Sequence, residues 1–254
     1  MAREPGDAVT VAQSTLGLGG LPTIELVHGE TPGEVERLTQ RFDVLLTDPP
    51  YNSKRKSYFA LPWQKHQNRD FGEWDSVANT DYTWLRSAMR VLKENAALLI
   101  FSPFERLGDY EALLEDLGCV YRTAIVWHKT NGVVHVPAYK SSVEAFVYAS
   151  RGKPFFRPWE TQKSFAAHNF IEGPSCMGNE RRRWDHPTQK PEYLLQRLLL
   201  RHSEPGFWVL DPFMGVGSVP AVCLKSGRNC VAIEKDAEYF RRAQTRISEL
   251  GGNA

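Results

Sequence analysis

Short apolar runs alternate with longer amphipathic segments along most of the chain. The runs rich in Val, Ile, Leu and aromatic residues are predicted to be strands: Thr23–Val27, Phe42–Thr47, Ala96–Phe101, Tyr121–Trp127, Val143–Ala149, Phe207–Leu210 and Cys230–Ile233. The amphipathic segments are predicted to be helices: Pro32–Gln40, Tyr82–Lys93, Phe104–Leu117, Pro191–His202, Val219–Lys225 and Ala237–Leu250. This alternation predicts an α/β fold, a seven-stranded, mostly parallel sheet with helices on both faces. Val143–Ala149 follows Tyr121–Trp127 without an intervening helix, so these two strands are expected to pair antiparallel.

Composition adds the size and class of the protein. The chain has 254 residues, of which 42% are hydrophobic and 24% charged, as in an ordinary globular protein. This length predicts one domain over residues 21–254, preceded by a flexible tail over residues 1–20. No apolar stretch approaches the ~20 residues that cross a bilayer, and the tail lacks a signal-peptide core. We therefore expect a cytoplasmic protein without a membrane partner. The four cysteines show no metal-ligand spacing, so no metal site is expected.

Two segments lack any periodicity, Asn52–Asn79 and Ser150–Asp185. Loops of this length in a compact domain tend to be functional. The net charge is only +1, but basic residues gather within both segments. Such clusters suit a phosphate backbone, although a solvated loop is the plainer meaning of adjacent charges. The candidate DNA contacts are Lys54, Arg55, Lys56, Arg181, Arg182 and Arg183.

The tetrapeptide Asp48-Pro49-Pro50-Tyr51 directly follows the predicted strand Phe42–Thr47. Prolines lack a backbone N–H and hold φ near about −65°, so the chain leaves the sheet here in a stiff, extended turn. The turn places a carboxylate, proline carbonyls and an aromatic ring at the carboxyl edge of the sheet, where open α/β folds bind ligands. Such a cluster can hold a planar, amino-bearing molecule. Taken alone, it is equally consistent with the simple end of a strand.

A second strand-to-helix turn lies at Asp211–Ser218, where Gly215 and Gly217 allow close approach of the backbone to a ligand. Ser218 is the expected N-cap of the helix that follows. Glu234 comes at the end of the next predicted strand, 23 positions after Asp211. An acidic residue about twenty positions after such a turn is placed to bind ribose hydroxyls. Together these features predict a nucleoside cofactor site.

With both turns in view, the chain resembles the amino-directed DNA methyltransferases that use S-adenosylmethionine. It is most similar to their circularly permuted beta class, whose catalytic motif precedes the cofactor motif. The resemblance covers nearly all of Thr23–Leu250. It is carried by Asp48–Tyr51 as D-P-P-Y, Asp211–Ser218 as D-P-F-x-G-S-G-T, His186–Pro191 as H-P-T-x-K-P, Trp127–Asn131 as W-x-K-x-N, and Val27–Glu30, with Glu30 where Asp is usual.

The resemblance implies a Rossmann-like methyltransferase domain with a small target-recognition insertion. Residues 52–79 then form a DNA-binding loop on the catalytic side, and residues 150–185 the recognition region. The catalytic candidates are Asp48, Pro49, Pro50 and Tyr51. The cofactor candidates are Asp211, Phe213, Met214, Gly215, Gly217, Ser218, Glu234, Thr188, Lys190 and Glu30. His128 and His186 are interpreted as structural or substrate-contacting residues rather than general bases.

The implied reaction is methyl transfer from S-adenosylmethionine to the N6 amino group of an adenine flipped out of double-stranded DNA. Asp48 and the Pro49 carbonyl would accept the amino hydrogens, and Tyr51 would stack on the base. Attack on cytosine C5 requires a Pro-Cys nucleophile, which the chain lacks.

Cytosine-N4 methylation remains the nearest alternative. A non-catalytic nucleic-acid-binding subunit, or an RNA or protein-amide methyltransferase, is a more distant one. The short recognition region predicts a short target sequence or help from a second subunit in a homodimer. A bacterial or phage origin and a cognate restriction endonuclease fit the same family.

Overall fold

The computed structural model describes residues 8–11, 21–51, 82–131, 142–157, 168–176, 183–184 and 188–251, with only the backbone for 8–11. Its strands are β1 (Ala8–Val11), β2 (Ile24–His28), β3 (Phe42–Thr47), β4 (Leu92–Ser102), β5 (Val120–Lys129), β6 (Val143–Ser150), β7 (Phe170–Gly173), β8 (Trp208–Asp211) and β9 (Asn229–Glu234). Its helices are α1 (Gly33–Arg37), α2 (Thr83–Val91), the short 3₁₀ helix η2 (Phe104–Arg106), α3 (Leu107–Asp116), α5 (Glu192–His202), α6 (Ser218–Ser226) and α7 (Ala237–Gly251).

These strands form one sheet in the order β1-β2-β9-β8-β3-β4-β6-β5-β7. The five strands from β2 to β4 run parallel, and β6 is antiparallel to both β4 and β5. The prediction of a mostly parallel α/β sheet is confirmed, as is the antiparallel pairing of β5 with β6. The described residues form nine strands, two more than the seven that were predicted. β1 pairs with β2 inside the expected tail, and β7 pairs with β5 inside the expected recognition region.

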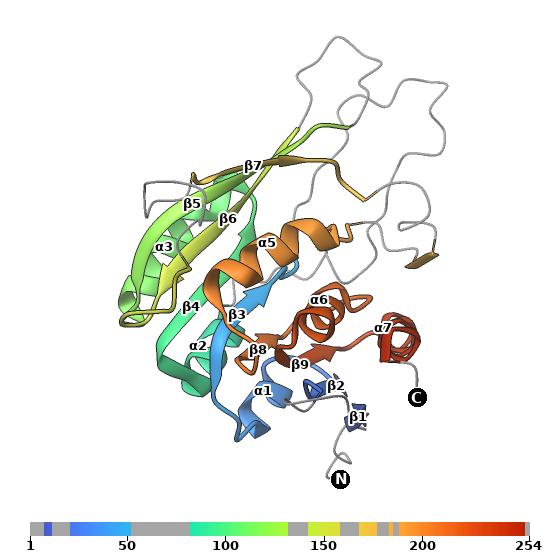
Figure 1. The fold of residues 1–254 in the computed structure, drawn as a ribbon. Coiled ribbons are helices and arrows are strands. Elements are labelled where there is room, and N and C mark those ends of the chain that lie inside the picture. Colours follow the sequence, from blue (N-terminus) through green and yellow to red (C-terminus); the bar gives the residue numbers. More distant parts are fainter. Residues whose placement is uncertain are drawn as a thin grey trace, which may run out of the picture.

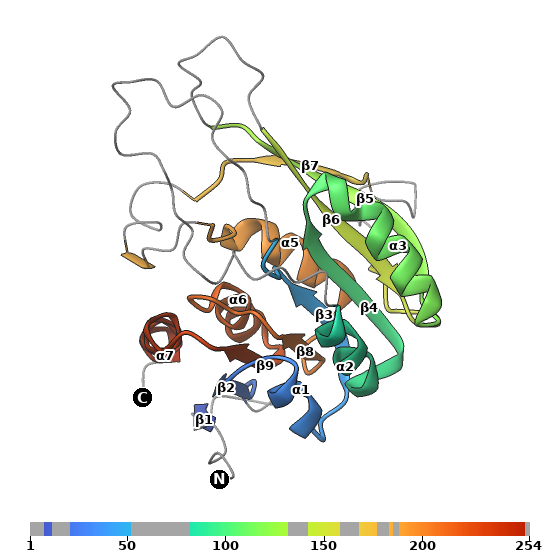
Figure 2. The same ribbon diagram turned by 180° about the vertical axis from the view of Figure 1, so that it is seen from behind.

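Helices cover both faces of the sheet, as Figures 1 and 2 show from opposite sides. α5, α6 and α7 bury Leu195, Val222 and Ile247 against one face, in a core that includes Val44 and Leu46 of β3. α1, α2 and α3 bury their apolar side chains on the other face, in a core that includes Leu45. This alternation along β3 follows from the two-residue period of a strand. A strand covered on both faces reads as a continuous apolar run, as Phe42–Thr47 does.

The order of the sheet reverses between β8 and β3. From β3 the chain continues to β4 on one side, and from β8 it continues to β9 on the other. Two crossovers that run in opposite directions leave a crevice at the carboxyl ends of the central strands, which is where doubly wound folds bind ligands. Asp48 follows β3 and Asp211 ends β8, so the fold brings both sequence motifs to this crevice.

Candidate active site

The two motifs meet through a buried hydrogen bond. The Thr47 hydroxyl at the end of β3 donates to Asp211 Oδ1 at 2.8 Å. The same oxygen accepts the backbone N–H of Phe213 at 3.2 Å. Asp211 is 2% exposed, so its carboxylate lies beneath the cofactor loop and holds it to β3. Burial raises the pKa of Asp211 to about 7, against the opposing effect of these two hydrogen bonds.

The tetrapeptide Asp48–Tyr51 presents Asp48 at the edge of the sheet with both carboxylate oxygens engaged. The Tyr51 hydroxyl donates to Oδ1 at 2.6 Å, and the Lys190 ammonium donates to Oδ2 at 2.5 Å. Burial raises the pKa of Asp48, and the ammonium of Lys190 opposes that rise. Burial and the neighbouring Asp48 charge raise the pKa of Tyr51 well above its ordinary value, so Tyr51 is a neutral donor.

A chain of charges continues from Asp48 away from the cofactor loop. Lys190 also lies 3.4 Å from Glu144 Oε2, and Lys129 donates to Glu144 Oε1 at 3.0 Å. Burial lowers the pKa of Lys190, but Asp48 and Glu144 reverse this and leave it above its ordinary value. Burial raises the pKa of Glu144, but Lys190 and Lys129 leave it below its ordinary value. Both shifts favour the charged forms of Lys190 and Glu144 near neutral pH.

Aromatic rings flank the Lys190 ammonium. Its Nζ lies 5.6 Å from the ring centroid of Tyr51 and 4.9 Å from that of Phe101, at the end of β4. A cation at this distance is attracted by a ring face, and the partly exposed ring of Tyr51 also suits a planar base. The place on Asp48 thus combines oxygen acceptors with aromatic surfaces.

On the cofactor side, Glu234 at the end of β9 accepts two backbone N–H groups. Oε2 accepts from Gly215 at 2.9 Å, and Oε1 accepts from Asp236 at 2.8 Å. Each oxygen keeps a second lone pair, which is what a ribose diol requires. Burial raises the pKa of Glu234, and the two N–H donors oppose that rise.

The glycines of the loop have separate uses. Gly215 has φ 53° and is half-buried, so its backbone lies open to a ligand. Gly217 has φ 77° and is buried; an added Cβ would lie 3.0 Å from Ala243 of α7. Gly217 therefore lets α6 pack closely on α7, and the residues fit a nucleoside cofactor chiefly through Phe213, Gly215 and Glu234. Asp211, Met214, Gly217 and Ser218 lie buried beneath that surface.

The prediction that Ser218 caps α6 is wrong. The N-cap is Gly217, in the left-handed region, and no side chain caps the helix. Ser218 is the first helical residue, and its hydroxyl accepts from the buried Arg246 at 3.1 Å. A glycine can take the positive φ that the turn requires, whereas serine there would be strained.

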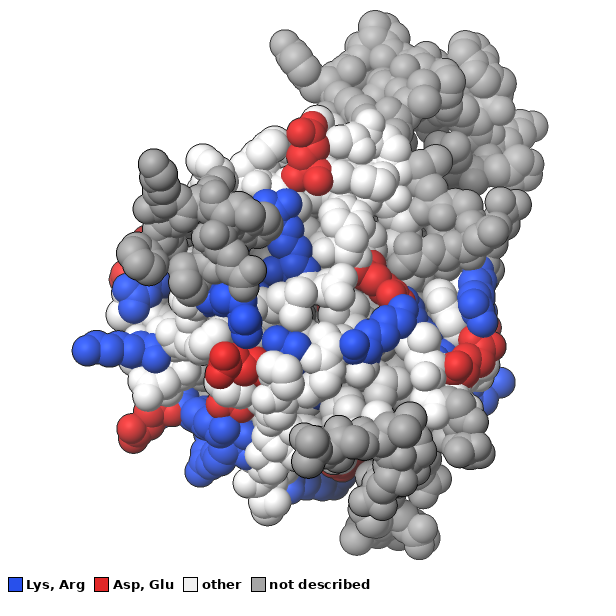
Figure 3. Space-filling model, in the orientation of Figure 1, with Lys and Arg blue, Asp and Glu red and all other residues white. Residues whose placement is uncertain are grey.

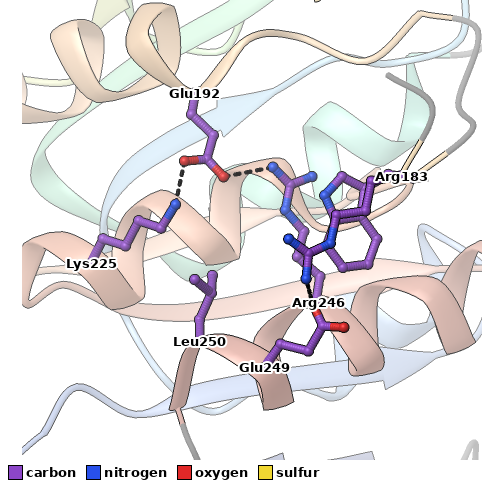
Figure 4. A pocket seen from close by; sticks show the side chains of 7 residues that line it. Arg183, Glu192, Lys225, Arg246, Glu249 and Leu250 are labelled. Atoms are coloured by element: carbon purple, nitrogen blue, oxygen red, sulfur yellow. Dashed lines mark hydrogen bonds and ion pairs between the residues drawn. The ribbon is translucent and has the colours of Figure 1, made fainter. Parts of the chain in front are cut away.

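Arg246 of α7 is a contact that sequence patterns did not reveal. The Arg246 side chain is 1% exposed, and its guanidinium also donates to Glu192 Oε1 at 2.7 Å. Glu192 follows Lys190 by two residues in the chain. Figure 4 shows Glu192 between Arg246 and Lys225, with Arg183 paired to Glu249 beside them. These side chains line a pocket of about 170 Å³ behind the cofactor loop, and their charges are already paired with one another. An arginine on the buried face of an amphipathic helix was the available signal.

Other predicted residues lie apart from Asp48. Glu30 is exposed and follows β2, in a turn held by the Gly29 N–H on Glu234 O at 3.0 Å and the Thr31 hydroxyl on Pro212 O at 2.8 Å. Thr188 is half-buried, two residues before Lys190. Lys190 was predicted to serve the cofactor, yet its contacts lie on the base side, at Asp48 and Glu144.

The structure also divides the expected recognition region. Ser150 pairs with Ala97 and Val120, so the segment from Ser150 to Arg157 begins at the edge of the sheet opposite Asp48. Arg151 donates there to the carbonyls of Met89 and Leu92. Phe170–Gly173 returns along β5 toward the catalytic edge.

The predicted DNA contacts are mostly outside the described residues, which exclude Lys54, Arg55, Lys56, Arg181, Arg182 and His186. Arg183 pairs with Glu249 of α7, and its guanidinium lies over the ring of Trp184. On the face in Figure 3, Lys and Arg side chains lie beside Asp and Glu at several places over the described atoms. His128 pairs with Glu172 at 3.0 Å.

The W-x-K-x-N residues support this edge of the sheet. Trp127 donates to the Tyr193 hydroxyl of α5 at 2.8 Å, and Asn131 accepts from the backbone and side chain of Ser175. Among the described residues, no group of His, Cys, Asp and Glu has the arrangement of a metal site, and no helix could span a membrane.

Comparison with known proteins gives a consistent result. A family model described as DNA methylase, of the N6/N4 type, matches residues 42–245. The type II methyltransferase M2.LlaDCHI of Lactococcus lactis subsp. cremoris is 26% identical over 240 residues, 88% of this chain and 89% of that protein. M2.DpnII of Streptococcus pneumoniae is 27% identical over 238 residues, 87% of this chain and 88% of that protein.

Solved structures share the fold. An M1.HpyAVI–SAM complex matches with a TM-score of 0.67 and 23% identity, over 88% of this chain and 99% of that one. The cytosine-N4-specific PvuII DNA methyltransferase matches with a TM-score of 0.66 and 15% identity, over 88% and 86%.

Proposed function

Since the chain belongs to the N6/N4 DNA methylase family, we propose that it transfers a methyl group from S-adenosylmethionine to the N6 amino group of adenine in double-stranded DNA. The family supports the reaction class, and the SAM complex of a protein with the same fold supports the methyl donor. The names of two relatives as type II methyltransferases support a role in restriction-modification.

The observation that carries the proposal is the position of Asp48 at the switch point of the sheet, with the Tyr51 hydroxyl bonded to it. The hydrogen bond from Thr47 to Asp211 joins the end of the same strand to the loop that we assign to the cofactor. An exocyclic amine is a poor nucleophile because its lone pair is delocalised into the ring. Oxygen acceptors on both amino hydrogens favour a pyramidal nitrogen and free that pair. Asp48 Oδ2 and the Pro49 carbonyl are the acceptors we assign, and they act as preorganised electrostatic groups.

Tyr51 supplies surface for the flipped base, worth on the order of 1–3 kcal/mol of stacking per base. When bound, S-adenosylmethionine supplies an electrophilic methyl on its sulfonium. Glu234 would hold the ribose, and the backbone at Gly215 would lie against the cofactor. The methyl donor and the target base would then lie on the two sides of the Thr47–Asp211 hydrogen bond, and holding them in this arrangement contributes much of the rate enhancement.

Adenine is favoured over cytosine by the aspartate that begins the tetrapeptide. By resemblance, cytosine-N4 enzymes more often carry serine there. Nuclease digestion and mass spectrometry of DNA incubated with the protein and S-adenosylmethionine should yield N6-methyladenine. N4-methylcytosine without N6-methyladenine would reverse the choice of base.

Asp48→Ala tests the mechanism. We expect transfer to fall by about 10²- to 10³-fold or more, because the amino group loses its charged acceptor. The Kd for S-adenosylmethionine, measured by calorimetry, should stay within about twofold, since Glu234 and Gly215 are untouched. Full activity of this variant would show that another group receives the amine.

A further inference from the structure

The Lys190 ammonium occupies the place on Asp48 that the target amine needs. Asp48 Oδ1 accepts from Tyr51 at 2.6 Å and Oδ2 from Lys190 at 2.5 Å. Like the amino group of a base, the ammonium is an N–H donor lying among the rings of Tyr51 and Phe101. Oδ2 keeps a second lone pair, but the ammonium lies over the ring of Tyr51, on which the base would stack. A base that stacks on this ring and donates to Asp48 Oδ2 therefore displaces Lys190, whose side chain is 7% exposed.

A buried cation cannot be displaced without a new counter-ion, because an unpaired buried charge costs several kcal/mol. Glu144 of β6 provides one. Its Oε2 is buried, accepts no hydrogen bond from the described residues, and lies 3.4 Å from Lys190 Nζ. Its Oε1 is held by Lys129 at 3.0 Å, so the carboxylate is fixed with one oxygen facing Lys190.

We propose that Glu144 is a positioning residue that receives the Lys190 ammonium when the target base binds, and so frees Asp48 Oδ2 for the amino group. No proton changes place, because Lys190 is cationic in both positions. Within the described part of the chain, the ionisable groups around it are Asp48, Glu144, Lys129 and Tyr51. The raised pKa of Lys190 fits a permanently charged side chain. The proposal rests on the proposed function, since it takes Asp48 as the amine acceptor.

The geometry has a consequence that a purely structural role lacks. With Glu144→Gln, Lys190 has only Asp48 as a charged partner and should resist the base. With Lys190→Met, the obstacle is gone and Glu144 is no longer needed. The Glu144→Gln defect in base binding should therefore disappear in the Lys190→Met background, which is a test of coupling between the two residues.

The experiment first maps the methylated position, using the wild-type protein and modification-sensitive sequencing. A duplex that keeps the target base and carries 2-aminopurine as its neighbour then reports flipping, because the fluorescence of the probe rises when the base beside it leaves the stack. Glu144→Gln should lower the flipped fraction and raise the KM for DNA by about tenfold or more, with kcat less affected. The Kd for S-adenosylmethionine should be unchanged, which also shows that the variant is folded. Glu115→Gln, an exposed acid on α3, is the matched control.

The double variant Glu144→Gln with Lys190→Met should flip the base as well as Lys190→Met alone. Wild-type flipping by Glu144→Gln overturns the proposal, and so does a double variant that stays as defective as Glu144→Gln. Should Glu144→Gln lose cofactor binding, Glu144→Asp replaces it, with a smaller defect expected and the same recovery required.

The proposed function fails separately. It fails if the mapped base is cytosine or if Asp48→Ala retains activity. For a cytosine target, 2-aminopurine beside that cytosine serves in the same flipping comparison.

Discussion

The two halves of the site lie along one edge of the sheet, but different kinds of interaction hold them in place. The base side consists of four charged side chains that contact one another: Asp48 directly after β3, Lys129 of β5, Glu144 of β6, and Lys190 shortly before α5. The cofactor side consists of two carboxylates fixed by backbone N–H groups. Asp211 accepts from Phe213, and Glu234 accepts from Gly215 and Asp236.

This difference indicates which half can rearrange. Backbone donors in a tight turn cannot leave their carboxylate without unfolding the loop, so the cofactor side is preformed. A lysine between two carboxylates has two partners of the same kind, so the base side can exchange contacts at little cost. Under the proposed function, the half that would receive the cofactor is rigid, and the half that would receive a base from DNA is adjustable.

Arg246→Met should disturb both halves, because Arg246 contacts Ser218 after the cofactor loop and Glu192 after Lys190. It is 1% exposed, and loss of a buried charged partner typically costs about 3 kcal/mol of unfolding free energy. Urea denaturation should show this loss, and the Kd for S-adenosylmethionine should rise together with a fall in kcat. Arg241→Met, an exposed arginine on the same helix, should change neither. An effect confined to one half would show that Arg246 does not join them.

Gly217→Ala isolates the cofactor side. Its φ of 77° and the 3.0 Å approach of an added Cβ to Ala243 predict a destabilisation of about 2 kcal/mol, from backbone strain and the contact together. The loop should also shift, so the Kd for S-adenosylmethionine should rise.

Gly206→Ala is the matched control for this substitution. Its φ is 86°, but an added Cβ would meet nothing within 4 Å, so it carries the strain alone. It should cost about 1 kcal/mol and leave the cofactor Kd unchanged. If the two substitutions lower the free energy of unfolding and change the cofactor Kd equally, the close contact of Gly217 with α7 has no role in either.

The same contrast explains how far the sequence could be interpreted. Asp211, Gly215 and Glu234 are close together in the chain, so strand, turn and trailing acid predicted this half of the site. The base side joins residues up to 142 positions apart. Asp48, Lys129 and Lys190 each belong to a recognised motif, but no pattern in the sequence showed that these motifs contact one another. Glu144 had a weak signal, as the one acid in the apolar strand Val143–Ala149. The pairing of Lys190 with Asp48 depends on how α5 packs on the sheet, which no local pattern encodes.

Ionisation of Asp211 is the smallest effect and separates the halves by pH. Burial raises the pKa of Asp211 to about 7, whereas an unfolded aspartate titrates near about 3.9. The fold therefore favours the protonated form, and this contribution to stability is present below about pH 4 and is lost as the pH rises through about 7.

If Asp211 pairs with the ammonium of S-adenosylmethionine, the cofactor favours the carboxylate. Its affinity should then rise from pH 6 to pH 8, by at most about tenfold per unit below the pKa. Calorimetry over this range should show the slope in the wild type and lose it in Asp211→Asn. On the base side, the raised pKa of Lys190 and the lowered pKa of Glu144 keep both residues charged over the same range. A slope that survives in Asp211→Asn would place the titrating group elsewhere, with Glu234 next because burial raises its pKa too.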